Sequence, residues 1–111
     1  MLTAARFRQL ALALPGSSEG AHHDHPDFRS NGRVFASLWP DGQTAMVVLA
    51  PPQQRALCTS DPAAFRPANG AWGRNGCTLV TLAAAAPETV AAALHDALLL
   101  AQSRPKGRSR T

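Results

Sequence analysis

Apolar and polar residues near the N-terminus repeat with a helical period. Thr3 is a candidate N-cap for this helix and Pro15-Gly16 ends it, so we expect the first helix over residues 3–14. The apolar positions follow the i, i+3, i+4, i+7 spacing of a half-buried helix: Phe7, Leu10, Ala11 and Leu14.

The next segments are typical of short strands joined by tight turns. They predict three strands, over residues 19–23, 27–30 and 33–39. Asn31-Gly32, between the second and third, is a strong hairpin signal. The Pro-Asp-Gly sequence at 40–42 predicts another turn, and the nearly continuous apolar stretch over 44–49 suits the centre of a sheet.

The second half of the chain predicts further helices and strands. The elements expected are a helix over 51–58, a loop over 65–70, a strand pair around Trp72 and over 77–82, and a final helix over 87–101. Pro51-Pro52 and Pro87 suit the first turns of the two helices. Hairpin turns dominate and no βαβ pattern recurs. The sequence therefore predicts an α+β fold with two layers, in which the first and last helices pack on one face of a largely antiparallel sheet.

Alternation along residues 33–39 places Arg33, Phe35 and Trp39 on one face of their strand. If that face is open, aromatic rings beside an arginine suit nucleic acid, since bases stack on such rings. The alternative is a face covered by another element, such as the helix over 51–58. The sequence leaves both interpretations open.

Length and composition favour one globular domain over residues 1–103, because 45% of the 111 residues are apolar. No apolar run reaches the roughly 20 residues of a membrane span, and we expect a cytoplasmic monomer. Cys58 and Cys77 lie far apart in the sequence, with no CxxC pair and no secretory context, so we expect buried free thiols.

The formal net charge of +4 comes from the C-terminal tail. Over residues 1–103, the arginines and the acidic residues balance. The excess is carried by Arg104, Lys106, Arg108 and Arg110. We expect the segment 104–111 to be disordered, serving either as a solvated end or as an arm that contacts phosphates.

Residues 22–25 read His-His-Asp-His and form a candidate metal or proton-transfer site. In an extended strand His23 and His25 point to one face, and His22 and Asp24 to the other, so no metal spacing is satisfied. A polar strand edge before a turn is the favoured interpretation. Sequence motifs of known catalytic sites are absent, and we expect a protein that is not an enzyme and needs no cofactor or metal.

Trp72 lies in the sequence GAWGRNGCT, which spans residues 70–78. An exposed Trp72 would be a stacking platform, with Arg74 beside it for phosphate. A tryptophan between glycines is more often an apolar plug over a core, and we favour this interpretation.

Several of these segments, taken together, resemble the MmcQ/YjbR-like family. The shared segments are LPG, HPDFR, NGRVFASL, PDG, PPQQ and GAWGRNGCT, spread over residues 3–101. The chain departs from the family pattern at Asp24, where Gly is usual, and at Cys77, where Trp is usual. The resemblance implies a two-layer α+β fold similar to secretion-chaperone-like proteins and to a double-wing DNA-binding domain.

By that fold analogy, the resemblance implies DNA binding without an established mechanism. The expected phosphate contacts are Arg29, Arg33 and Arg74, joined by the tail residues Arg104, Lys106 and Arg108. The alternatives are a small-molecule pocket formed by His22, His25 and Trp72, and a protein-interaction module that uses the Leu99 and Leu100 side of the last helix.

Overall fold

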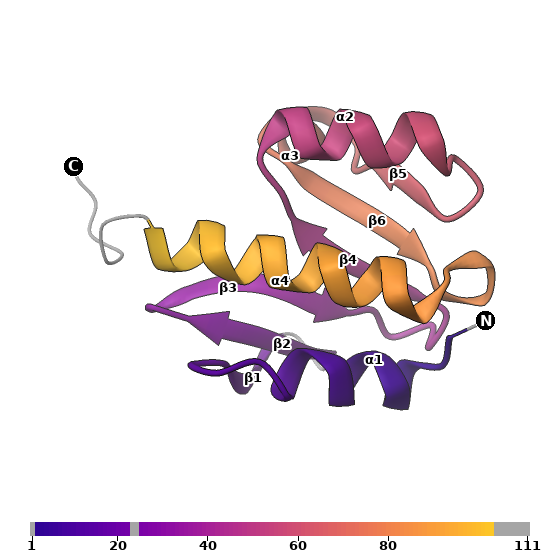
Figure 1. The fold of residues 1–111 in the computed structure, drawn as a ribbon. Helices are drawn as coiled ribbons and strands as arrows, with labels where there is room; N and C mark the ends of the chain where they lie inside the picture. Colours follow the sequence, from indigo (N-terminus) through magenta and orange to yellow (C-terminus); the bar gives the residue numbers. More distant parts are fainter. Residues whose placement is uncertain (1, 23–24, 104–111) are drawn as a thin grey trace.

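The computed structural model describes residues 2–22 and 25–103. Along the chain the elements are α1 (Ala4–Leu12), β1 (Ser18–His22), β2 (His25–Ser30), β3 (Arg33–Leu38), β4 (Thr44–Val48), α2 (Pro51–Ser60), β5 (Phe65–Pro67), α3 (Gly70–Arg74), β6 (Cys77–Thr81), a 3₁₀ turn (Leu82–Ala84) and α4 (Pro87–Ser103) (Figure 1).

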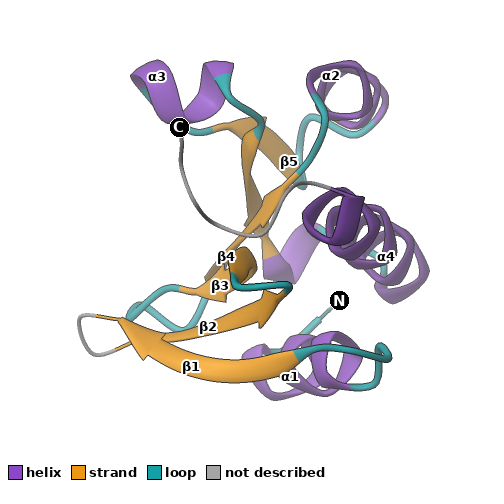
Figure 2. Ribbon diagram, turned by 90° about the vertical axis from the view of Figure 1, so that its left-hand side faces the viewer, coloured by secondary structure: helices purple, strands orange, loops and turns teal. Residues whose placement is uncertain are grey.

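The strands form one six-stranded antiparallel sheet in the order β1-β2-β3-β4-β6-β5. Figure 2 shows α1, α2 and α4 on one side of this sheet and α3 on the other. The expected α+β class and antiparallel sheet are confirmed, and α1 and α4 cover one face as predicted. Among the described residues, no helix has the length and apolar character needed to cross a membrane.

The core lies between the sheet and the α1–α4 layer. Phe7 of α1 meets Phe28 of β2 with ring centroids 6.1 Å apart, and both side chains are fully buried. The buried stripe of α4 consists of Val90, Ala93, Leu94, Ala97, Leu98 and Ala101. This spacing buries one face of a long helix against the sheet, as the apolar periodicity predicts.

Local sequence signals correctly predict the ends of several elements. Oγ1 of Thr3 accepts a hydrogen bond from the Arg6 amide at 3.1 Å, so Thr3 is the N-cap of α1. Asn31 and Gly32 have φ values of 56° and 73°, which a two-residue hairpin turn requires. Nδ2 of Asn31 also donates to the Ala101 carbonyl at 3.2 Å, and this bond ties the β2–β3 turn to the end of α4.

An irregularity in β3 overturns the expected face of Phe35. Phe28 pairs with Ala36 and Arg29 pairs with Val34, so Phe35 is an extra residue on β3, a β-bulge. Phe35 and Ala36 both turn into the core, and alternation shifts by one residue beyond them. The prediction that Phe35 shares a face with Trp39 is therefore wrong, since Phe35 is fully buried while Trp39 is 40% exposed.

The segment around Trp72 also differs from prediction. Residues 70–74 form the short helix α3, and the segment expected to be a loop contains β5, which pairs with β6. Trp72 is 73% exposed, so the interpretation as a buried plug is wrong. Two glycines in a five-residue helix give a weak local signal, and contacts from other elements decide its conformation.

Candidate functional site

A groove crosses the sheet face opposite α1 and α4. Its floor comes from alternate residues of β3, β4 and β6, and Trp72 of α3 forms one wall. Two adjoining halves share the residues His25, Ser37, Met46, Trp72 and Cys77. We call this feature the open-face groove.

The two halves of the open-face groove differ in lining. The β6 half, of about 380 Å³, adds Trp39, Ala68, Asn69 and Leu79. The β2 half, of about 350 Å³, adds Asp27, Arg29, Val34 and Val48. Each half has the volume of a small-molecule site and a mostly apolar lining with a few polar groups, as such sites usually have.

Trp72 overhangs the open-face groove because a side chain of α2 holds α3 in place by a hydrogen bond. Nε2 of the buried Gln54 donates to the Gly73 carbonyl at 3.0 Å and to the Cys77 carbonyl at 3.1 Å. Gly73 packs so closely on the preceding segment that a Cβ there would lie 1.9 Å from the Ala68 oxygen. These contacts place α3 beside β6 and leave the Trp72 side chain over the groove.

An ion pair forms the polar end of the β2 half. Nε and Nη2 of Arg29 donate to the two carboxylate oxygens of Asp27 at 2.8 and 3.0 Å. Asp27 is only 3% exposed, and Gly20 of the neighbouring strand leaves room for the pair. The hydrogen bond to Asp27 and its negative charge raise the pKa of Arg29. The pair is neutral overall, and Nη1 of Arg29 lies outside it.

The Cys77 thiol lies in both halves of the open-face groove. Partial burial raises the pKa of this thiol above its ordinary value. The thiol therefore stays protonated near neutral pH, and a protonated thiol is a weak nucleophile. Cys58 is likewise a free cysteine with a raised pKa, and both are only partly buried.

The structure brings together two of the three residues expected to form a ligand pocket. His25 and Trp72 line both halves of the open-face groove. The backbone of His22 in β1 pairs with that of His25 in β2, while the side chain of His22 and the residues His23 and Asp24 are outside what the structure describes. Among the described residues, no group of three or more His, Cys, Asp and Glu side chains is placed to hold a metal ion.

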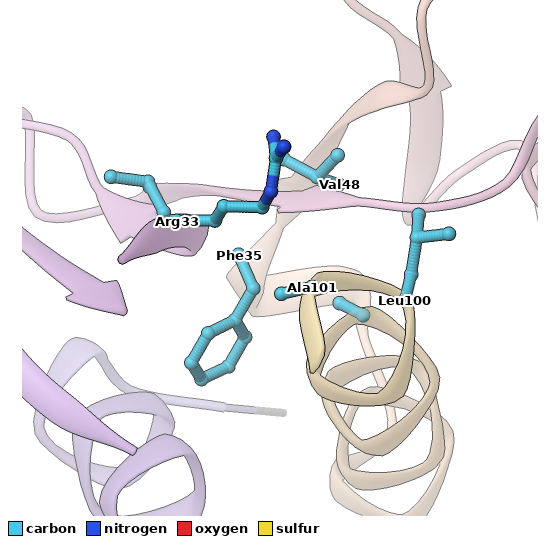
Figure 3. Close-up of a pocket in the computed structure, with 7 residues that line it drawn as sticks. Arg33, Phe35, Val48, Leu100 and Ala101 are labelled. Carbon is cyan, nitrogen blue, oxygen red and sulfur yellow. The ribbon is translucent and has the colours of Figure 1, made fainter. Parts of the chain in front are cut away.

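The arginines expected to contact phosphates lie apart. Arg29 lines the open-face groove, whereas Arg33 lines a separate small pocket beside α4 (Figure 3). Arg74 lines a shallow depression near Arg55 on the other side of α3. The tail residues Arg104, Lys106 and Arg108 lie outside the described residues. On α4, Leu99 is 49% exposed and Leu100 is half-buried.

Sequence reasoning missed most of the floor of the open-face groove. The residues missed include Asp27, Val34, Ser37, Met46, Val48 and Leu79. The alternation of buried Ala45 and Val47 with Met46 carries the signal for β4. For Ser37 the alternation with Trp39 carries the signal, whereas the bulge at Phe35 brings Val34 to the groove face against the predicted alternation.

Comparison with known proteins agrees with this fold. The model of the YjbR family matches residues 12–100. No curated protein matches the chain. Among solved structures, protein DR2400 of Deinococcus radiodurans, described by its DUF419 domain, is similar with a TM-score of 0.77 and 22% sequence identity. The match covers 99% of this chain and 84% of that one, and it shows a common fold.

Proposed function

The chain belongs to the YjbR family, and for this member we propose a role in binding a neutral, largely apolar small molecule in the open-face groove, without catalysis. One observation carries the proposal: two exposed tryptophans, Trp39 and Trp72, border a groove with a floor that is mainly apolar. Aromatic walls of this kind favour a ligand that contains a ring, since ring faces stack or meet edge to face.

The electrostatics of the groove support an uncharged ligand. Asp27 and Arg29 neutralise each other, so the β2 half offers hydrogen-bonding atoms without a net charge from this pair. A carboxylate or phosphate ligand would have to compete with Asp27 for the guanidinium. A hydroxyl or carbonyl group meets Nη1 of Arg29 without that competition.

The state of the polar residues supports binding rather than catalysis. The Cys77 thiol is protonated near neutral pH because its pKa is raised. Both carboxylate oxygens of Asp27 already accept hydrogen bonds from Arg29, which leaves this acid poorly placed to accept a proton from a ligand.

Trp72→Ala is expected to weaken the binding of N-phenyl-1-naphthylamine, a neutral aromatic dye that emits more strongly in apolar surroundings. Loss of a large aromatic contact of roughly 1.5–3 kcal/mol raises the dissociation constant by about tenfold to a hundredfold. Trp72 is 73% exposed, so the free energy of unfolding changes by less than about 0.5 kcal/mol. A fluorescence titration gives the first quantity and urea unfolding the second.

Leu99→Ala is the matched control for this titration, because Leu99 is an exposed apolar residue of α4 outside the groove. Its dissociation constant for the dye is expected to equal that of the wild type. Failure of the dye to bind the wild type saturably, or equal binding by Trp72→Ala, contradicts the proposed function.

Nucleic acid is the second candidate, and it is favoured by the exposure of Trp39 and Trp72 in a groove that Arg29 also lines. Base stacking on an aromatic side chain contributes about 1–3 kcal/mol per base, and single strands offer free bases. A single strand is then expected to bind more tightly than a duplex.

Fluorescence anisotropy with labelled 20-nucleotide strands at low salt tests this second candidate. If nucleic acid binds, Trp72→Ala weakens binding. Arg74→Ala is expected to reduce the slope of log binding constant against log salt concentration by about one, the effect of losing one phosphate contact. Absence of binding by the full-length chain at tens of micromolar removes the candidate.

A further inference from the structure

A second, smaller pocket adjoins the open-face groove, in the gap between β3 and β4. This strand-gap pocket has a volume of about 60 Å³. Its lining is Arg33, Val34, Phe35, Val48, Ala97, Leu100 and Ala101 (Figure 3). All of these side chains except Arg33 are apolar, so the pocket suits a hydrocarbon group.

The bulge in β3 creates this gap. β3 and β4 pair only from Ala36–Val47 to Leu38–Ala45, while Arg33 and Val34 at the start of β3 pair with β2 alone. In Figure 3 the Arg33 side chain extends from β3 toward Val48 of β4, while Phe35 points into the core. Leu100 points from α4 toward the same gap.

Val34 and Val48 connect the strand-gap pocket with the open-face groove. Both valines line the pocket and also the β2 half of the groove, near Asp27 and Arg29. Val34 is 38% exposed, so it borders the groove without closing it. The pocket has room for roughly two to four carbon atoms, since one water takes about 30 Å³ of liquid volume.

We propose that the ligand of the open-face groove carries a short, branched alkyl group that enters the strand-gap pocket between Val34 and Val48. The ring of the ligand lies against Trp72, and its polar substituent meets the Asp27–Arg29 pair. This assignment rests on the proposed function, because it gives the ligand of the same groove a chemical class: a ring with a neutral polar group and a small alkyl substituent.

Displacement of bound N-phenyl-1-naphthylamine by a series of alkylphenols tests the proposal. The series contains phenol and its isopropyl, tert-butyl and n-hexyl derivatives, each as the 3- and the 4-isomer. In one of the two isomer series, we expect each carbon that enters the pocket to tighten binding by about fourfold relative to phenol. The n-hexyl compound is expected to gain nothing over the branched ones, because the pocket is too small for its chain.

Substitutions at Leu100 should move this preference in opposite directions. Leu100→Phe fills the strand-gap pocket, so the gain from the branched alkyl groups is lost while phenol binds as to the wild type. Leu100→Ala enlarges the pocket, and the n-hexyl compound then binds more tightly than the isopropyl one. Leu99→Phe is the matched control, since the neighbouring Leu99 does not line the pocket, and its affinities are expected to equal those of the wild type.

The outcomes separate this inference from the proposed function. If phenol displaces the dye but Leu100→Phe retains the full alkyl gain, the strand-gap pocket is a packing gap that no ligand enters, and the inference is overturned while the groove remains. If no alkylphenol displaces the bound dye, the inference is overturned as well. If the dye itself does not bind, the proposed function fails first. Leu100→Ala keeps the test decisive should Leu100→Phe prove unstable in urea unfolding.

Discussion

Gly76→Ala is expected to lower the free energy of unfolding by more than about 3 kcal/mol, a large part of the roughly 5–15 kcal/mol that holds a domain folded. A Cβ at residue 76 would lie 1.9 Å from the Leu49 carbonyl oxygen, a distance that no packing adjustment of a side chain relieves. Gly76 also has a φ of +103°, which an alanine adopts only with strain.

The backbone around Gly76 has little freedom to move away from this clash. The Gly76 amide donates to the Gly73 carbonyl at 3.1 Å, and the Gly76 carbonyl accepts from the Leu49 amide at 2.9 Å. The hydroxyl of the buried Thr78 donates to the same carbonyl at 3.0 Å. Relief of the clash would break bonds that hold α3 and the end of β4 together.

Gly42→Ala separates the clash from the strain of positive φ. Gly42 has a φ of +70°, and a Cβ there would meet nothing within 4 Å. This variant is expected to lose only about 1–2 kcal/mol, the cost of the left-handed conformation for an L residue. Urea unfolding of both variants measures the difference. Equal losses at the two positions would show that the close approach to Leu49 contributes nothing.

Gln54→Leu is expected to destabilise the protein by about 1–3 kcal/mol and also to weaken binding in the open-face groove. The variant loses both hydrogen bonds from the Gln54 amide, to Gly73 of α3 and to Cys77 of β6. Each of those carbonyls also accepts a hydrogen bond from a backbone amide, so neither is left unpaired in the variant. The free energy lost is therefore that of two hydrogen bonds, without the larger cost of burying an unpaired carbonyl. Because α3 then loses its tie to α2, Trp72 is no longer held over the groove.

Gln53→Leu is the matched control, because Gln53 lies one residue earlier on α2 and is exposed. It is expected to change the free energy of unfolding by less than about 0.5 kcal/mol and to leave dye binding unchanged. Urea unfolding and titration with N-phenyl-1-naphthylamine measure the two effects. A Gln54→Leu variant that matches the control in both would show that α3 is held without this side chain.

Features with a local cause were predictable from the sequence. The Thr3 cap, the Asn31-Gly32 turn and the apolar stripe of α4 depend on neighbours along the chain, and the structure contains all three. The α+β class followed from the order of such signals together with the family resemblance.

Features with a distant cause were not predictable in this way. At the bulge, Phe35 and Ala36 both point into the core, so Phe35 and Val34 lie on the faces opposite to those expected from their alternation with Trp39. The helix α3 depends on Gln54 and on close packing at Ala68, which lie outside its own sequence. Trp72 could therefore be recognised as a candidate site residue, but its exposure over the groove could not.

The placement of the tryptophans has a consequence for spectroscopy. The chain contains two tryptophans and no tyrosine, and both tryptophans border the open-face groove. Ultraviolet emission of the unlabelled protein thus arises almost wholly from that one surface. A single Trp→Phe replacement at either position would turn the molecule into a reporter of one wall of the groove, with no dye attached.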